Sequence, residues 1–223
     1  MLDQLIIGDK NSYDDFGASL ASRKIGTPAK KKIRETIPFS NITYDFSKIN
    51  GEIYWEDREL EYVFEMTAET PEKLEDTKAA FSDWVMNVFQ EKLHDPFIPD
   101  FHFIATYESM SYDDEKGLDK TTATVKFTAY PYKIANIPCS YLIHIPSDSI
   151  VNVSVVNNSS HPITVTFKAT SMFSTYTTVC DGETKIAYFL GEDVGKLQCG
   201  LRHLSISSQL ETDIEITYVE EVL

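Results

Sequence analysis

Residues 60–68 read LEYVFEMTA, and this stretch decides the class of fold. Apolar residues occupy every second position from Leu60 to Ala68, and Glu61 and Glu65 stand between them. A period of two places alternate side chains on opposite faces of a strand, so the stretch predicts an antiparallel β-strand with one buried face. The same period recurs in segments 123–129, 151–155, 163–169 and 214–218. We therefore expect a mainly β protein.

One segment has a helical period instead. After Thr70 and Pro71, apolar residues follow at steps of three and four as far as Leu93. Thr70 suits the N-cap and Pro71 suits the first helical position. The pattern predicts one amphipathic α-helix of about six turns over 71–93, packed on a sheet through an inner face that includes Phe81 and Trp84.

The composition changes near residues 133–136. Residues 1–133 hold both tryptophans and the expected helix, whereas 134–223 hold no tryptophan and have strands at short intervals, as in an all-β sandwich. A chain of 223 residues is long enough for two cores. We predict an N-terminal β-sandwich with the helix and hairpin or loop extensions at 1–133, and a second β-sandwich at 134–223. Asn50-Gly51 and Asp181-Gly182 predict tight hairpin turns.

The charge of the chain limits its partners. Thirty-five acidic residues against 20 basic ones give a net charge of −15, which argues against nonspecific binding of nucleic acid or anionic membranes. No apolar run approaches the roughly 20 residues that cross a bilayer, and no secretory signal is recognisable at the N-terminus. The three cysteines are widely spaced, which indicates reduced thiols. We expect a protein made in the cytosol.

No motif in the sequence predicts catalysis. The five histidines stand alone, without metal-ligand spacing, and the glycine-rich phosphate loops and the nucleophile elbow are missing. Adjacent acids are common, but a chain this acidic contains such pairs by chance. We therefore predict no catalytic residue, no cofactor and no metal site, and do not expect an enzyme.

Residues 23–34 are unlike the rest of the chain, because they contain six bases and no acid. The bases are Arg23, Lys24, Lys30, Lys31, Lys32 and Arg34. The segment is too charged for a core, so a mobile loop or an arm on an acidic protein surface is the favoured interpretation. The predicted partner is the acidic strand region of a neighbouring copy of the chain. Its acids are Glu56, Asp57, Glu59 and Glu61.

Taken in order, several stretches resemble a known family. They are IPFSNITYDFS at 37–47, GEIYWEDREL at 51–60 and FTAYPYK at 127–133, followed by VVNN at 155–158, HPI at 161–163 and the closing strand at 214–218. Their order and spacing resemble the distal tail proteins (Dit) of long-tailed phages and prophages.

The resemblance implies a fold and a role. The second domain would be a galectin-like, jelly-roll sandwich. Six copies would form a ring that links the tail tube to the host-adsorption apparatus or baseplate, with other phage tail proteins as partners. DNA would pass through the lumen without specific binding, and no membrane contact is implied. The protein would belong to the virion and be assembled in the bacterial cytoplasm.

Two other functions remain open from the residues alone. A carbohydrate-binding module is the main alternative, although sugar sites in lectin-like sandwiches usually stack on a tryptophan. Tyr141, Tyr176 and Tyr188 could take that place, and a glycan array would test it. A hydrolase of cell-wall material would need a pair of facing acids that the sequence does not reveal.

Overall fold

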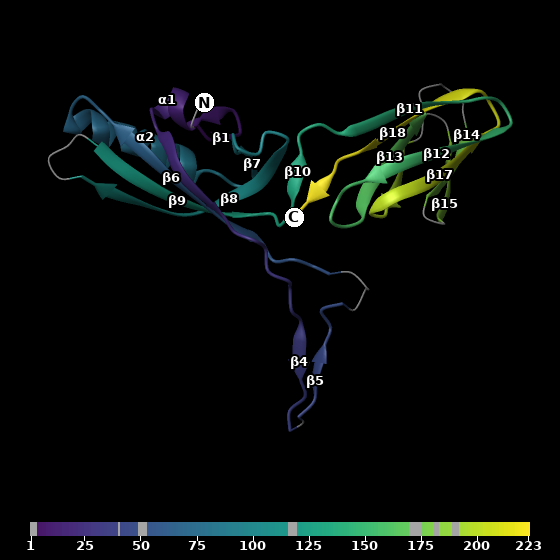
Figure 1. The fold of residues 1–223 in the computed structure, drawn as a ribbon, viewed down its shortest axis with the longest axis horizontal. Coiled ribbons are helices and arrows are strands. Elements are labelled where there is room, and N and C mark those ends of the chain that lie inside the picture. The colour runs from purple at the N-terminus through teal and green to yellow at the C-terminus, as the bar shows by residue number, and fades with distance from the viewer. Residues whose placement is uncertain are drawn as a thin grey trace. The chain divides into compact units, whose positions relative to one another are not determined.

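The structure is a computed structural model that describes residues 4–39, 41–48, 53–115, 120–169, 175–180, 183–188 and 192–223. Its contacts divide the chain into two compact units (Figure 1). Unit 1 comprises Met1–Lys133 with Leu223, and unit 2 comprises Ile134–Val222. Strands predominate in both units, which confirms the mainly β fold class.

In the described part of unit 1, most strands join one sheet, and their order is β2-β1-β7-β8-β9-β6-β3. The strands are β1 (Ile6–Ile7), β2 (Lys10–Asn11), β3 (Ser19–Ile25), β6 (Arg58–Thr67), β7 (Glu91–His94), β8 (Phe101–Asp114) and β9 (Lys120–Ala129). The helices are α1 (Ser12–Phe16) and α2 (Pro71–Met86). A separate hairpin of β4 (Arg34–Thr36) and β5 (Thr43–Asp45) completes the unit.

The core of unit 1 lies between the sheet and α2. The predicted alternation of β6 is confirmed, because Leu60, Tyr62, Phe64 and Met66 are all buried. Phe81 of α2 is fully buried against them and meets the Phe64 ring edge-on at 5.2 Å. Other members of this core are Leu74, Val85, Leu93, Phe103, Ala123, Val125 and Phe127.

The helix ends earlier than predicted. α2 runs from Pro71 to Met86, and its N-cap is Thr70, whose hydroxyl accepts from the Lys73 amide as expected. Gln90 then adopts a positive φ of 53°, which turns the chain into β7. Leu93 is buried as predicted, but it belongs to a strand, and Phe89 is exposed rather than on an inner face. The prediction of a helix to Leu93 was therefore wrong.

A second, short helix was not predicted. The Asn11 side chain accepts hydrogen bonds from the amides of Tyr13 and Asp14 at the start of α1. Gly17 ends the helix with φ of 64°, a conformation that favours glycine. Trp84 of α2 is half-buried and packs against the core. Phe16 of α1 stacks on its ring with a centroid distance of 4.8 Å.

Beyond the sheet, β3 and β6 continue into an arm, which we define as residues 26–57 (Figure 1). Gly26 donates to the Glu59 carbonyl, Lys31 donates to that of Tyr54, and Lys30 bridges to Trp55. These contacts extend the β3–β6 register along the base of the arm. The hairpin of β4 and β5 forms its distal part, and every described residue of 31–46 is exposed.

Unit 2 is a sandwich of two sheets, with orders β11-β18-β13-β16 and β12-β17-β14-β15. The strands are β11 (Cys139–Ile145), β12 (Ser149–Asn157), β13 (Ile163–Ala169), β14 (Thr175–Cys180), β15 (Glu183–Tyr188), β16 (Glu192–Leu197), β17 (Gly200–Ser208) and β18 (Thr212–Tyr218). Short β10 (Lys133–Ala135) pairs with β19 (Glu221–Val222). Both sheets contribute to one core, and the Tyr176 and Tyr218 hydroxyls donate across it to the carbonyls of Phe167 and Val156.

Both predicted hairpin turns, Asn50-Gly51 and Asp181-Gly182, lie outside the described residues. Next to the second turn, β14 and β15 pair in antiparallel fashion with Cys180 opposite Glu183. Cys139 and Cys199 are free thiols in this structure. Among the helices in the described ranges, none is long and apolar enough to cross a membrane.

Candidate interface site

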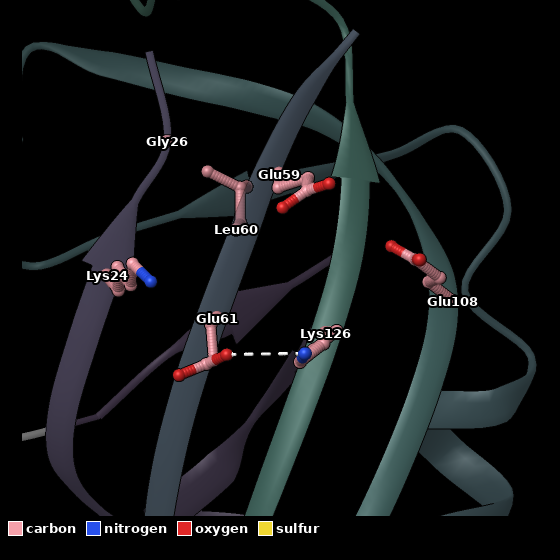
Figure 2. Close-up of a pocket in the computed structure, with 7 residues that line it drawn as sticks. All are labelled: Lys24, Gly26, Glu59, Leu60, Glu61, Glu108 and Lys126. Carbon is pink, nitrogen blue, oxygen red and sulfur yellow. Dashed lines mark ion pairs between the residues drawn. The ribbon is translucent and has the colours of Figure 1, made fainter. Parts of the chain in front are cut away.

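The base of the arm carries a charged pocket on the sheet (Figure 2). It has a volume of about 100 Å³ and collects residues from four neighbouring strands. The lining residues are Lys24, Gly26, Glu59, Leu60, Glu61, Glu108 and Lys126. Figure 2 shows the Glu61 carboxylate directed at Lys126, at a separation of 3.6 Å between their charged atoms. Lys24, Glu59 and Glu61 are among the residues predicted from sequence.

The structure brings the predicted bases and acids together within one chain. β3 pairs with β6 so that Lys24 lies opposite Glu61, and the Glu56 amide donates to the Ala29 carbonyl. The basic and acidic segments are thus two strands of the same ladder. Exposed pairs of this kind contribute only about 0 to 1 kcal/mol each, so the arrangement orients side chains more than it stabilises the fold.

Arg23 has a structural partner inside unit 1. Its guanidinium donates to the Asp95 carboxylate at 2.5 Å and lies 4.5 Å from the centroid of the Phe97 ring. The Tyr62 hydroxyl donates to the same carboxylate at 3.2 Å. Burial, followed by the charge of Asp95, raises the pKa of Tyr62, so the phenol stays protonated and keeps donating. These contacts anchor Arg23 beside the core.

The remaining predicted bases lie on the arm. Lys30 stands over the Trp55 ring, with 5.8 Å from its amino group to the ring centroid. Lys31 and Lys32 are exposed, and Arg34 pairs with Asp45 at 3.2 Å. Hydrogen bonds from Ser47, followed by the contact with Arg34, lower the pKa of Asp45. The exposed lysines therefore cluster where the distal hairpin begins.

The arm also carries an apolar face that the charge analysis missed. In the hairpin register, Arg34 faces Asp45 and Thr36 faces Thr43, so these polar pairs share one face. The opposite face contains Ile33, Ile37, Ile42, Tyr44 and Phe46, with Glu35 as its charged member. All five are exposed, from 38% for Phe46 to 57% for Ile42. The alternation of residues 33–37 and 42–46 is the signal that would have revealed this apolar face.

Two stretches quoted for the family resemblance meet in the core of unit 1. Arg58 begins β6 and is 4% exposed. Its Nε and Nη2 both donate to the Pro131 carbonyl, at 3.0 and 2.6 Å, and its guanidinium lies over the Phe103 ring. Burial lowers the pKa of Arg58. The contact joins the start of β6 to the segment that follows β9.

The other sequence predictions can be placed as well. No group of three or more His, Cys, Asp or Glu residues suited to a metal ion occurs in the part of the chain that the structure describes. Of the tyrosines proposed for sugar stacking, Tyr176 is buried at 1% exposure and so is unavailable to a ligand. Tyr141 is exposed but stacks on Tyr218, and the side chain of Tyr188 lies outside the described residues.

Sequence comparison finds nothing similar: no protein-family model and no curated protein matches the chain. Comparison of structures does. The crystal structure of the Dit (gp 19.1) protein of phage SPP1 matches with a TM-score of 0.68 and 11% identity, covering 97% of this chain and 98% of that one. That protein is described as a paradigm of hub adsorption apparatus in Gram-positive infecting phages. The chain therefore has a Dit-like fold, which confirms at the level of fold the resemblance seen in the sequence.

A second structure, the phage P2 baseplate in its activated conformation with Ca, matches with a TM-score of 0.43 and 7% identity, covering 97% of this chain and 98% of that one.

Proposed function

We propose that this protein is a structural component of a phage tail tip or baseplate, with the role of a distal tail protein. The observation that carries the proposal is the fold: both units, in the same order, match a hub protein of a phage adsorption apparatus over nearly the whole of both chains. A chain that is mostly β, acidic and without recognisable catalytic motifs suits a part that holds other proteins in place.

In this proposal six copies form a closed ring that links the tail tube to the host-adsorption apparatus. The ring binds other phage tail proteins as a virion component, after assembly in the bacterial cytoplasm. DNA passes through the lumen without specific binding, and the net charge of −15 supports this because acidic walls repel phosphate. Unit 1 would be the ring-forming domain and unit 2 an independent galectin-like domain.

The bases at the start of the arm would steer copies into register. Lys30, Lys31 and Lys32 are exposed, and so are Glu56 and Asp57, which a neighbouring copy would present. Glu59 is exposed as well, whereas Glu61 lies opposite Lys24 and pairs with Lys126 in its own chain, so Glu61 would add less to such a contact. Contacts between exposed charges are weak and screened by salt. Ring assembly should therefore weaken as the salt concentration rises.

Negative-stain electron microscopy of the purified full chain tests the proposal, and closed rings of six are expected. Sedimentation velocity then compares the parent with a variant carrying Lys30→Glu, Lys31→Glu and Lys32→Glu. That variant should shift toward monomer with little change in melting temperature. The matched control, Lys73→Glu with Lys168→Glu and Lys196→Glu, makes the same change in net charge elsewhere and should still assemble.

Two results would contradict the proposal in different ways. A parent protein that shows no closed rings at any concentration would argue against a self-assembling ring. Rings that persist in the Lys30–Lys32 variant, with unchanged salt dependence, would leave the ring in place and remove the steering role of the basic segment.

A further inference from the structure

The charged pocket at the base of the arm is built from two rows of side chains that run across the sheet (Figure 2). In the first row, Glu61 lies opposite Lys24 of β3 on one side and opposite Lys126 of β9 on the other. Its carboxylate pairs with the Lys126 amino group at 3.6 Å. The acid of this row is therefore balanced by bases of its own chain.

The second row contains acids and no base. Glu59 lies opposite Thr128 of β9, and the Thr128 hydroxyl donates to the Glu108 carboxylate at 3.1 Å. On its other side Glu59 faces Gly26, where an added Cβ would lie 2.8 Å from the Glu59 carbonyl oxygen, so this position supplies no side chain. We call Glu59, Thr128 and Glu108 the acid row. Both its carboxylates are exposed, and neither has an ion-pair partner within the part of the chain that the structure describes.

The pocket therefore suits a cation. Its charged lining residues, two lysines and three glutamates, sum to −1. The surplus of acid lies in the acid row, because both lysines flank Glu61. A lysine ammonium carries three N–H donors, enough for two carboxylates. A volume of about 100 Å³ fits the end of one side chain and not a folded segment.

Every copy carries exposed lysines of this kind on its arm. Residues 27–34 contain four bases and no acid. Lys31 and Lys32, which we call the arm lysines, are exposed and form no ion pair with any residue that the structure describes. The arm lysines and the acid row are thus surfaces of opposite charge, and each lacks a partner in its own chain.

The arm lysines do not reach the pocket of their own chain. A backbone hydrogen bond joins Gly26 to Glu59 at the pocket, and the same register continues outward along the arm. Five residues farther out, the Lys31 amide donates to the Tyr54 carbonyl. Five extended residues span about 16 Å, which exceeds the length of a lysine side chain. An arm lysine that fills such a pocket therefore belongs to another copy.

We propose that an arm lysine of one copy inserts its ammonium into the acid row of the next copy. Two different surfaces of the chain meet in this contact, and heterologous contacts of this kind can close into a ring. The contact adds Glu108 of β8 to the acids predicted from sequence, all of which precede β6 or belong to it. The inference rests on the proposed function and names the pocket that receives the basic segment.

Zero-length cross-linking of the full chain tests the contact directly. Unlabelled and isotope-labelled protein are mixed at high salt, dialysed to low salt and treated with a carbodiimide, which condenses an amine and a carboxylate in contact into an amide. Links between an arm lysine and a glutamate of the acid row should join one labelled and one unlabelled peptide. Links that join only peptides of the same label would place the lysine in its own pocket and overturn the proposal. Assembled protein without such links would overturn it too.

Sedimentation velocity measures what the acid row contributes. Glu108→Gln should weaken self-association about threefold to fivefold, as the loss of an exposed ion pair does. Asp76→Asn is the matched control, because it makes the same change in net charge at an exposed position of α2. It should change self-association less than about twofold, since salt screens a charge that is far from the contact. Equal effects of the two substitutions would contradict a specific contact.

An exchange of charge between the two surfaces tests whether they meet each other. One variant carries Lys31→Glu with Lys32→Glu, and the other carries Glu59→Lys with Glu108→Lys. Each alone brings like charges together and should stay monomeric at concentrations where the parent assembles. An equal mixture should assemble, because every contact between the two variants then joins opposite charges. A mixture that stays monomeric would overturn the proposal.

The outcomes separate this contact from the proposed ring. Closed rings that persist in the variant with Glu59→Lys and Glu108→Lys would refute the contact and leave the proposed function standing. Dimers that depend on the arm lysines and the acid row, without closed rings, would support the contact and count against the ring. A parent protein that stays monomeric at every concentration would count against both.

Discussion

Replacing Arg58 should destabilise unit 1 out of proportion to the size of the change. The guanidinium makes two hydrogen bonds to the Pro131 carbonyl and lies over the Phe103 ring at 5.4 Å. Pro131 is itself buried, so water cannot easily reach its carbonyl to replace the hydrogen bonds from Arg58. The contact joins two segments that are far apart in sequence.

The magnitude follows from what each substitution leaves behind. Arg58→Met keeps much of the volume but leaves a buried carbonyl without its donor, which costs about 1 to 3 kcal/mol. Removing the charge recovers part of its desolvation penalty, so the lower half of that range is expected. Arg58→Ala also removes the packing on Phe103 and opens a cavity, which brings the loss to about 2 to 5 kcal/mol.

Urea unfolding followed by tryptophan fluorescence measures this loss in the relevant unit. Both tryptophans, Trp55 and Trp84, lie in residues 1–133, so their emission reports unit 1. Arg34→Met is the matched control, because the exposed Arg34–Asp45 pair should contribute about 0 to 1 kcal/mol.

The free energies of unfolding should decrease in the order parent, Arg58→Met, Arg58→Ala. An Arg58→Met protein no less stable than Arg34→Met would refute the reasoning, since the buried carbonyl would then have needed no donor.

Three further predictions concern unit 1. Phe81→Ala should lower the free energy of unfolding by about 3 to 5 kcal/mol and Trp84→Ala by about 1 to 3 kcal/mol. The difference is expected because Phe81 is fully buried and Trp84 only half-buried. A larger loss for Trp84→Ala than for Phe81→Ala in urea unfolding would contradict this packing. Burial lowers the pKa of His94, and the charges of the neighbouring His102 and Lys92 lower it further. As the pH falls, His94 is therefore protonated in the unfolded chain before it is protonated in the folded protein. Melting temperature should accordingly fall as the pH drops below about 6.5, and His94→Asn should flatten this dependence; an unchanged slope would exclude His94 as its source. Gly26→Ala would place a Cβ 2.8 Å from the Glu59 carbonyl oxygen and should destabilise by about 1 to 3 kcal/mol, whereas a neutral result in the same assay would show that the arm base shifts easily.

The strands could be predicted from the sequence because the alternation of apolar and polar residues reflects which side chains are buried. In β6 and β9 every second residue enters the core, and the sequence shows that alternation directly. The helix end was less readable, because Val88 and Leu93 keep the apolar spacing although α2 ends at Met86 and the chain turns at Gln90 before it reaches Leu93. The turn brings β7 alongside β8, with which it pairs. The spacing of apolar residues along the chain does not predict this pairing.

The interface prediction had a similar limit. Bases near Lys24 and acids near Glu61 suggested two surfaces that attract, and attraction alone does not distinguish a neighbouring chain from the next strand. Pairing of β3 with β6 places them together in the same molecule. The apolar face of the hairpin could have been predicted from the alternation that includes Ile33 and Ile37. It was overlooked because the neighbouring lysines led to an interpretation of the segment by its charge alone.

The continuous register from Arg23 to Lys31 also has a mechanical consequence. The arm is built from the same strands that enter the sheet, and β6 is held between β3 and β9. Backbone hydrogen bonds in an antiparallel ladder lie perpendicular to the strands, so a pull along the arm loads many of them in shear at once. Force applied at the base of the arm, at Lys31 and Tyr54, would load the ladder of β6 and reach the core packed under α2 before that ladder could open bond by bond. The base of the arm is therefore suited to transmit a pull directly to the sheet of unit 1.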